Sequence, residues 1–232
     1  MKNFRLESIV LGIALIALGW LVGYGIQHRD NDRTVTVRGL SERTVQANKV
    51  TWPICFKAFG NDIGQLYADI QKTRTKVLEF LNKGGISESE ITVKAPMVED
   101  RKTNMYSDEI KAGQSRFYAT CIITVTSSDV DAVRKLISSQ EKLLSQGIVL
   151  ENQDWRGEVY EYTALNDIKP DMIAEATKNA REAAEKFAKD SHSKVGKIKT
   201  ASQGSFSIAD SDATTPHVKN IRVVTTITYL ID

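Results

Sequence analysis

The side chains that most often carry out chemistry in proteins are scattered along this chain. The three histidines are His28, His192 and His217, and none has a second metal ligand at helix or hairpin spacing. A metal centre needs several such ligands at a spacing that suits the geometry of the ion. The sequence therefore predicts no metal site.

The two cysteines, Cys55 and Cys121, are too few for a disulfide scaffold. Neither lies in a C-x-x-C or Cys/His cluster that would hold structural zinc. Alternation along the strands predicted around them places Cys121 on a core-facing side, whereas Cys55 lies on the face opposite Trp52. We therefore expect buried or shielded free thiols rather than a disulfide between them.

Two pairs of carboxylates are close enough in sequence to supply a general acid and a general base. They are Glu88 with Glu90 and Glu99 with Asp100. Both pairs fall at expected turns or strand ends, where a solvated surface position is the simpler interpretation. Nothing in the neighbouring sequence would shift the pKa of either pair. We therefore expect both pairs to lie on the surface without a catalytic role.

Sequence motifs for catalysis and for cofactor binding are also missing. The chain contains no G-x-S-x-G, P-loop, G-x-G-x-x-G or H-E-x-x-H motif, so hydrolytic, phosphoryl and hydride chemistry have no starting point. We expect no catalytic residues, no cofactor and no enzymatic activity. A ligand-binding or catalytic site assembled from distant residues remains the alternative, because such a site leaves no motif.

An apolar segment near the amino terminus is the strongest single pattern in the chain. The 18 residues from Ile9 to Ile26 carry no charge, and as a helix they would span about 27 Å, close to the thickness of the bilayer hydrocarbon. This length favours an uncleaved signal anchor over a signal peptide, which has a shorter apolar region and an A-x-A-like cleavage site. We predict a cytoplasmic stub and membrane anchor over 1–30 and a single extracytoplasmic domain over 31–232.

Positive charges flank the anchor on both sides and set its expected orientation. Lys2 and Arg5 precede it, and Arg29 and Arg33 follow it. The charges on the two sides compete, and Lys2, Arg5 and the amino terminus itself modestly favour a cytoplasmic amino terminus. The chain would then cross a bacterial inner membrane once and place its large domain in the periplasm or otherwise outside the cytoplasm.

Gly19 and Gly23 form a G-x-x-x-G pair within the anchor. Small residues one turn apart let two helix backbones approach closely in lipid. The pair is therefore a candidate for membrane helix packing, although glycine is common in membrane helices for other reasons.

The charge balance argues against nucleic acid as a partner. There are 31 Lys and Arg against 29 Asp and Glu, which gives a formal net charge of +2. Some RNA-binding domains are built from βαβ units. To bind RNA, such domains need a basic residue, a glycine and alternating aromatic residues on a central strand. The nearest fragment here is Arg116-Phe117-Tyr118, which lacks that pattern. We expect no nucleic-acid binding.

Two successive segments repeat one pattern of strand, amphipathic helix, glycine stop and strand. The order β-α-β-β-α-β predicts an α+β fold in which a split βαβ arrangement forms an antiparallel sheet with its helices on one face. Pro53 cannot donate to a strand ladder and predicts an edge, a bulge or a strand start. The first repeat comprises a strand over 45–59, a helix over 61–83 and a strand over 86–98; the second comprises a strand over 115–126, a helix over 128–146 and a strand from Ile148.

Further elements flank these two repeats. A β-branched strand is expected over 34–39, and strands near 195–208 and 218–230 close the chain. A third helix is expected after Pro170, with an inward stripe made mostly of alanine, which buries little area per residue and so needs a close partner surface. That stripe comprises Ile173, Ala176, Ala180, Ala183, Ala184, Phe187 and Ala188.

Several short motifs resemble, in their order and spacing, the SIMPL-domain (DUF541) proteins of bacterial envelopes. The resemblance implies a periplasmic or cell-surface domain of β-α-β units behind an amino-terminal membrane segment, a tendency to self-associate and no catalytic residues; some members are linked with oxidative-stress tolerance. Ser191-His192-Ser193 stands where the family often has glycine. The motifs are V-x-G-L-S-E-R over Val37 to Arg43, V-Q-A-N over 45–48, W-P-I over 52–54, Gly85-Ile86, Glu90-Ile91, Ala180-Arg181, Ala184-Glu185, Phe187-Ala188 and Gly196.

The residues and the resemblance together favour a membrane-anchored, non-enzymatic envelope protein. We expect it to be held in the membrane by residues 9–26 and to act as a homo-oligomer or with a protein partner, through its sheet edges or its alanine-rich helix. The alternative is a ligand-binding module or enzyme, which a deep pocket lined by converging polar groups would favour.

Overall fold

The computed structural model describes residues 3–27, 33–103, 113–151 and 157–232. These residues form helices and two antiparallel sheets, which confirms the predicted α+β class. Beyond the anchor the chain divides into two compact units. The β1–β9 unit contains residues 33–41, 173–205 and 223–232, and the β2–β5 unit contains 42–172 and 206–222.

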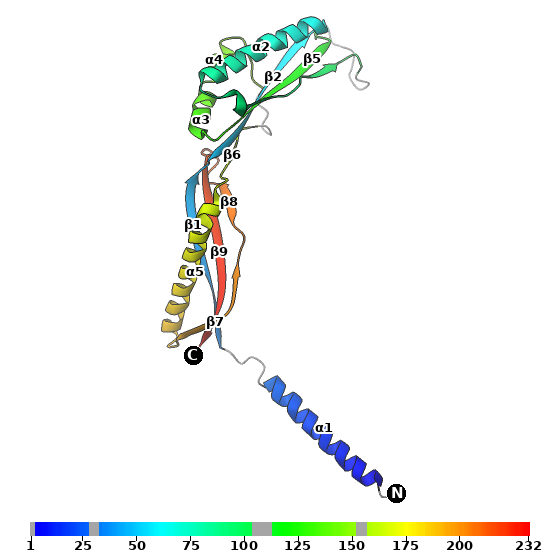
Figure 1. The fold of residues 1–232 in the computed structure, drawn as a ribbon, viewed down its shortest axis with the longest axis vertical. Helices are drawn as coiled ribbons and strands as arrows, with labels where there is room; N and C mark the ends of the chain where they lie inside the picture. The colour runs from blue at the N-terminus through cyan, green and yellow to red at the C-terminus, as the bar shows by residue number, and fades with distance from the viewer. Residues whose placement is uncertain (1–2, 28–32, 104–112, 152–156) are drawn as a thin grey trace. The chain divides into compact units, whose positions relative to one another are not determined.

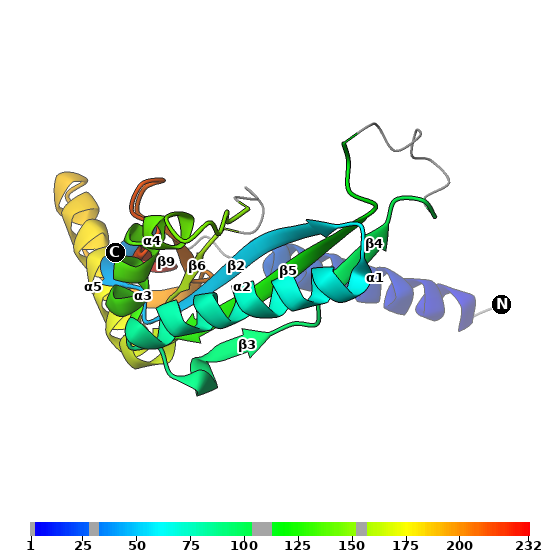
Figure 2. The same ribbon diagram turned by 90° about the horizontal axis from the view of Figure 1, so that it is seen from above.

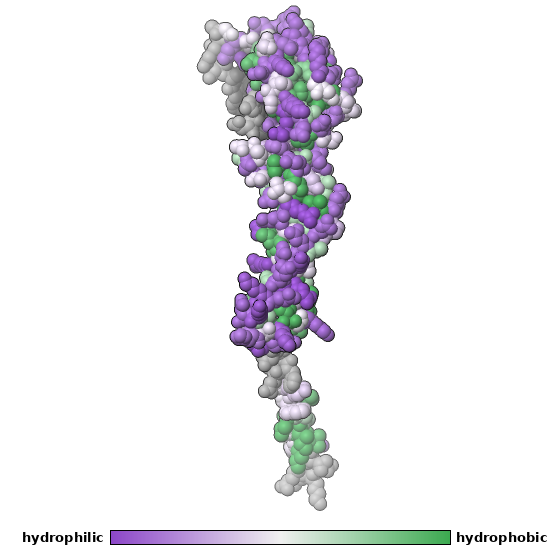
Figure 3. Space-filling model, turned by 90° about the vertical axis from the view of Figure 1, so that its left-hand side faces the viewer, coloured by the Kyte–Doolittle hydropathy of each residue, from purple (hydrophilic) through white to green (hydrophobic). Residues whose placement is uncertain are grey.

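Helix α1 (Asn3–Gln27) contains the predicted apolar segment. Its stretch from Glu7 to Tyr24 is long and apolar enough to cross a membrane, and none of it is buried in the protein (Figure 3). Trp20 and Tyr24 stack on each other and are exposed, as expected for aromatic residues at a membrane interface. Lys2, Arg29 and the predicted boundary at residue 30 lie outside the described residues.

The β2–β5 unit has the strand order that the two predicted repeats require. Its sheet runs β3-β5-β2-β6, with β4 also paired to β5, and every pairing is antiparallel. Helix α2 lies along β2 and β5 (Figure 2). The split βαβ prediction is therefore confirmed for this unit. The elements are β2 (Lys49–Gly60), α2 (Ile63–Lys83), η1 (Glu88–Glu90), β3 (Ile91–Val93), β4 (Met97–Asp100), β5 (Phe117–Ser127), α3 (Val130–Ser138), α4 (Glu141–Leu144) and β6 (Val159–Glu161).

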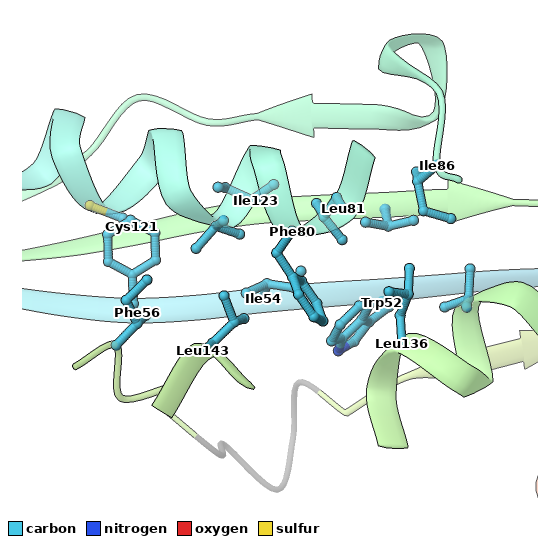
Figure 4. Close-up of a cluster of buried hydrophobic side chains, with 14 of the residues drawn as sticks. Trp52, Ile54, Phe56, Phe80, Leu81, Ile86, Cys121, Ile123, Leu136 and Leu143 are labelled. Atoms are coloured by element: carbon cyan, nitrogen blue, oxygen red, sulfur yellow. The ribbon is translucent and has the colours of Figure 1, made fainter. Parts of the chain in front are cut away.

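The core of this unit forms because alternate residues of β2 and β5 face the same helices. Trp52 and Phe56 of β2 are buried against side chains of α2, α3 and α4 (Figure 4). Leu81, Leu136 and Leu143 enter from those three helices in turn. The opposite face of the sheet lacks such a helical layer among the described residues.

The helix boundaries differ in detail from the sequence prediction. Helix α2 begins at Ile63, later than predicted, because Asp62 caps it: the Asp62 carboxylate accepts a hydrogen bond from the Gln65 backbone N–H at 2.8 Å. The predicted helix over 128–146 is split into α3 and α4. The cap of α3 is Asp129, whose carboxylate accepts a hydrogen bond from the Ala132 N–H at 2.9 Å.

Pro53 lies on the part of β2 whose outer edge β6 does not cover. Of the edge, bulge or strand start predicted for it, the edge is therefore the one found. The Cys55 carbonyl accepts from the Glu151 N–H at 2.8 Å, so the backbone groups of odd-numbered β2 residues point away from β5. Strand β6 pairs only with residues 49–51 of β2, so it ends before Pro53. The strand predicted from Ile148 is reduced to one bridge between Leu150 and Phe56.

The β1–β9 unit packs helix α5 against a second sheet (Figure 1). Its strands run in the order β1-β9-β7, and β8 extends the β7 side of β9. A single predicted sheet thus becomes two, because the long first and last strands pair with each other. The second sheet and its helix comprise β1 (Thr34–Gln46), α5 (Leu165–Asp190), β7 (Val195–Gln203), β8 (Ser207–Asp210) and β9 (Val218–Ile231). By residue range, β8, the end of β1 and the starts of α5 and β9 belong to the β2–β5 unit.

The inward stripe of α5 is narrower than the sequence predicted. Ala176, Ala180, Ala184 and Ala188 are buried, whereas Ala183 and Phe187 are exposed and were wrongly placed inward. A helix that sits very close to a sheet contacts it along only one row of side chains spaced four residues apart.

The start of α5 was also predicted too late in the chain. The helix begins at Leu165, ahead of Pro170. A hydrogen bond from the Asp167 N–H to the Ala164 carbonyl closes its first turn. Pro170 therefore lies inside the helix, where its nitrogen cannot donate a hydrogen bond to the preceding turn.

Gly39 sets how closely α5 approaches β1. A Cβ atom at Gly39 would lie 1.8 Å from the Ala176 carbonyl oxygen and 2.5 Å from the Ala180 nitrogen. Both distances are shorter than van der Waals contact allows, so a side chain at position 39 would clash with the helix backbone. The next two residues are also attached to α5: the Leu40 carbonyl accepts from Asn179 Nδ2 at 2.8 Å, and the buried Ser41 hydroxyl donates to the Glu175 carboxylate at 2.8 Å. This part of β1 is a docking site for the helix backbone.

We predict that Gly39→Ala lowers the free energy of unfolding by about 3 kcal/mol, because the added methyl group forces the helix away from the strand. Urea unfolding followed by circular dichroism measures the change. Gly157→Ala is the matched control and should have little effect, because a Cβ there meets nothing within 4 Å. Equal midpoints for Gly39→Ala and the parent chain would contradict the close contact.

Candidate functional site

The carboxylates that the sequence singled out all have structural partners, apart from Glu88, which is exposed. The Ser127 and Ser87 hydrogen bonds lower the pKa of Glu90, which closes a capping box with Ser87. Glu99 accepts a hydrogen bond from the Tyr118 hydroxyl. Arg116 donates hydrogen bonds from Nε and Nη2 to the Asp100 carboxylate, and these bonds lower the pKa of Asp100. Neither pair converges on a shared reacting atom.

The two histidines that the structure describes lie in different compact units. His192 lies in the turn after α5 with a φ of 55°, the left-handed region that usually takes glycine. His217 meets Tyr160 edge to face, with ring centres 6.0 Å apart. His28 lies outside the described residues. Within the described ranges no three His, Cys, Asp or Glu side chains gather where they could hold a metal ion.

Gly19 and Gly23 lie one turn apart on α1, and nothing in the described chain comes within 4 Å of a Cβ at either position. Their role in packing against another membrane helix stays a prediction.

Cys55 and Cys121 point to opposite faces of the β2–β5 sheet, as the alternation predicted. Cys121 stands opposite Phe56 and shares its core-facing side, whereas Cys55 stands opposite Ile122. Both side chains are buried, and neither forms a disulfide in the described part of the chain. Burial, with a smaller contribution from Cys55, raises the pKa of Cys121 to about 11.

A polar cluster surrounds Cys55 on the face away from the helices. Its thiol donates to the Glu151 carboxylate at 3.7 Å, and the Lys57 ammonium group pairs with the same carboxylate. A carboxylate that accepts the S–H favours the thiol, whereas nucleophilic chemistry needs the thiolate. Sequence analysis missed Glu151, because only the long-range pairing of residues 150 and 151 with β2 brings it to Cys55.

A cavity of about 590 Å³ lies beside this cluster, where the pairing along the outer edge of β2 is interrupted. Thr51 pairs with Val159, and Phe56 pairs with Leu150. Between these two pairings β2 advances by five residues, whereas the partner segment covers nine. Among the described residues, no strand pairing is formed with the outer edge of β2 beside Pro53. We call this space the β2 cavity.

The walls of the β2 cavity are mixed, with apolar side chains beside several carboxylates. Trp52 and Ile148 are buried in its wall, while Leu144 and Val149 are exposed. A wall of this kind is typical of small-molecule sites. The polar side chains among its described lining residues are Cys55, Gln140, Glu141, Glu151 and Glu158.

A second candidate surface is the outer edge of β7. Every residue from Lys197 to Gln203 is exposed, and no described strand pairs with this edge. The Gly204 N–H donates to the Val224 carbonyl at 2.8 Å, which fixes the alternation of hydrogen bonds along β7. By that alternation the backbone N–H and C=O groups of Ala201 and Gln203 point outward.

Comparison with known proteins identifies one family. The model of the SIMPL family, described as a protein of unknown function (DUF541), matches residues 35–229. No curated protein matches the chain significantly. The match runs through both compact units.

We predict that the raised pKa of Cys121 makes the fold sensitive to alkali. The folded state holds this proton to about pH 11, whereas an exposed thiol releases it near pH 9. The Cys121 contribution to stability is therefore complete below about pH 9 and is lost as the pH rises to about 11. Urea unfolding of the reduced protein over this range should show a steeper loss of stability than Cys121→Ala; equal slopes would contradict the shift.

Proposed function

The chain belongs to the SIMPL (DUF541) family of proteins of unknown function, and from that premise we propose that it is a membrane-anchored, non-enzymatic protein of the bacterial envelope that acts by assembly. Its partner in this proposal is a second copy of the same chain. Stress tolerance would then be a consequence of the assembly, without a reaction at any one residue.

The anchoring part of the proposal rests on α1. Its exposed apolar surface from Glu7 to Tyr24 needs a lipid environment, because leaving it in water costs free energy in proportion to its area. With the amino terminus in the cytoplasm, residues 33–232 would stand in the periplasm. The flanking charges at Lys2 and Arg5 support this orientation.

The single observation that carries assembly is the open outer edge of β7. A strand edge with free N–H and C=O groups is a template for pairing with another chain, and proteins that avoid this place charges or proline there. Lys197 and Lys199 protect only the first half of β7. The stretch from Thr200 to Gln203 is exposed, uncharged and free of proline.

We predict that Ala201→Pro lowers the oligomeric mass of the full chain in detergent micelles, measured by light scattering over a dilution series. Proline removes the outward N–H of Ala201 without touching the hydrogen bonds between β7 and β9. Ala201→Ser is the matched control, because it keeps the N–H and a small exposed side chain.

Two outcomes would count against this proposal. A monomer at every concentration of the parent chain would exclude self-assembly under these conditions. An oligomer that Ala201→Pro leaves intact but Gly19→Leu with Gly23→Leu dissociates would move the contact from β7 to the membrane helix, because leucine blocks close helix approach.

The β2 cavity supports a second function, which is binding of a small ligand. Its volume of about 590 Å³ falls within the range of about 300–1,000 Å³ that is usual for such sites. Apolar walls and converging polar groups are the features that distinguish a ligand site from a packing defect.

We predict that small-molecule hits from a saturation-transfer NMR screen of the full chain are lost in Leu144→Trp. Leu144 is exposed beside the cavity, so an indole can lie over it without disturbing the core. Phe187→Trp on exposed α5 is the matched control and should keep the hits. Hits that survive in Leu144→Trp would place ligand binding elsewhere.

A further inference from the structure

The charged side chains among the described lining residues of the β2 cavity are all acidic. Glu141 and Glu158 are exposed, and neither side chain forms a hydrogen bond or ion pair within the described part of the chain. Glu151 is the third carboxylate, and Lys57 pairs with it. The described lining contains no Lys or Arg.

The apolar part of the cavity adjoins these carboxylates. Leu144 and Val149 are 62% and 69% exposed, although such side chains are usually covered in a folded protein. They lie in the same lining as Glu141 and Glu158. A ligand that removes them from water gains about 25 cal/mol for each Å² of apolar surface buried.

The edge of β2 disfavours an extended peptide as the occupant. A peptide strand that pairs with β2 would need hydrogen bonds from the outward-pointing backbone groups between Thr51 and Cys55. Pro53 is the outward-pointing residue in the middle of this gap, and it has no N–H to donate. The cavity therefore suits a compact molecule better than an added strand.

We propose that the β2 cavity binds a small organic cation with an apolar body, such as an arylalkyl ammonium compound. The apolar body would contact Leu144, Val149 and Trp52, and the ammonium group would lie near Glu141 and Glu158. The inference rests on the ligand-binding function proposed for this cavity and is independent of assembly through β7.

Three probes of one shape test the charge preference. 4-Phenylbutylammonium carries a positive charge, 4-phenylbutanol is neutral and 4-phenylbutyrate is negative. Their affinities for the full chain in phosphatidylcholine nanodiscs are measured by calorimetry, with empty nanodiscs as the reference for partitioning into lipid. We expect the ammonium compound to bind tightest and the carboxylate weakest, with the affinity of the cation falling as salt is added.

Variants of the two exposed carboxylates locate the contact. Glu141→Gln and Glu158→Gln should each weaken binding of the ammonium compound about threefold, and the double variant about tenfold, because exposed ion pairs contribute modestly. The same changes should leave binding of 4-phenylbutanol unaltered. Glu88→Gln removes an exposed carboxylate elsewhere on the same unit and serves as the matched control.

The possible failures are distinguishable. Equal affinities for the three probes, all lost in Leu144→Trp, would keep a ligand site at the cavity but overturn the preference for a cation. Binding of none of the probes would overturn both. Binding of a lysine-rich peptide without any of the probes would replace the small molecule by a protein partner and overturn the proposal as well.

Discussion

The contact between Gly39 and the backbone of α5 is the constraint on which the β1–β9 unit depends. Each alanine side chain buries little area. The alanine stripe of α5 therefore stabilises the packing sufficiently only if the helix lies very close to the sheet. The missing side chain at Gly39 allows that approach. Asn179 and Glu175 of α5 then form hydrogen bonds with the two residues that follow Gly39, which fixes the position of the helix along the strand.

In the β2–β5 unit the corresponding constraint is the interrupted pairing on the outer edge of β2. One face of β2 has the continuous apolar alternation of a core strand, and its inner edge is fully paired with β5. Pro53 has no N–H to donate at the outer edge, so few hydrogen bonds are lost because the pairing with β6 ends before it. The cavity and the Cys55–Glu151 contact both follow from this departure. Candidate chemistry in this protein is thus a consequence of an incomplete sheet.

Local patterns predicted most of this fold, because helix periodicity, glycine stops and strand alternation are all written in neighbouring residues. The order of the β2–β5 sheet and the opposite faces of the two cysteines followed from them. Features that depend on contacts between distant residues did not. The separate second sheet, the exposure of Phe187 and the position of Glu151 each depend on which strands pair and in what register, and a single sequence does not specify this.

Anchoring changes what a weak surface contact can achieve. The uncharged part of the β7 edge, from Thr200 to Gln203, offers few outward backbone hydrogen bonds, and each is worth only about 1 kcal/mol net of competition from water. Such an edge would hold two free domains together only at high concentration. Chains fixed in one membrane meet at an effective concentration that reaches the millimolar range for short tethers. Under the proposed anchoring, an edge too weak to join two free copies of residues 33–232 could therefore suffice for assembly, and the half-protected charge pattern of β7 fits that intermediate strength.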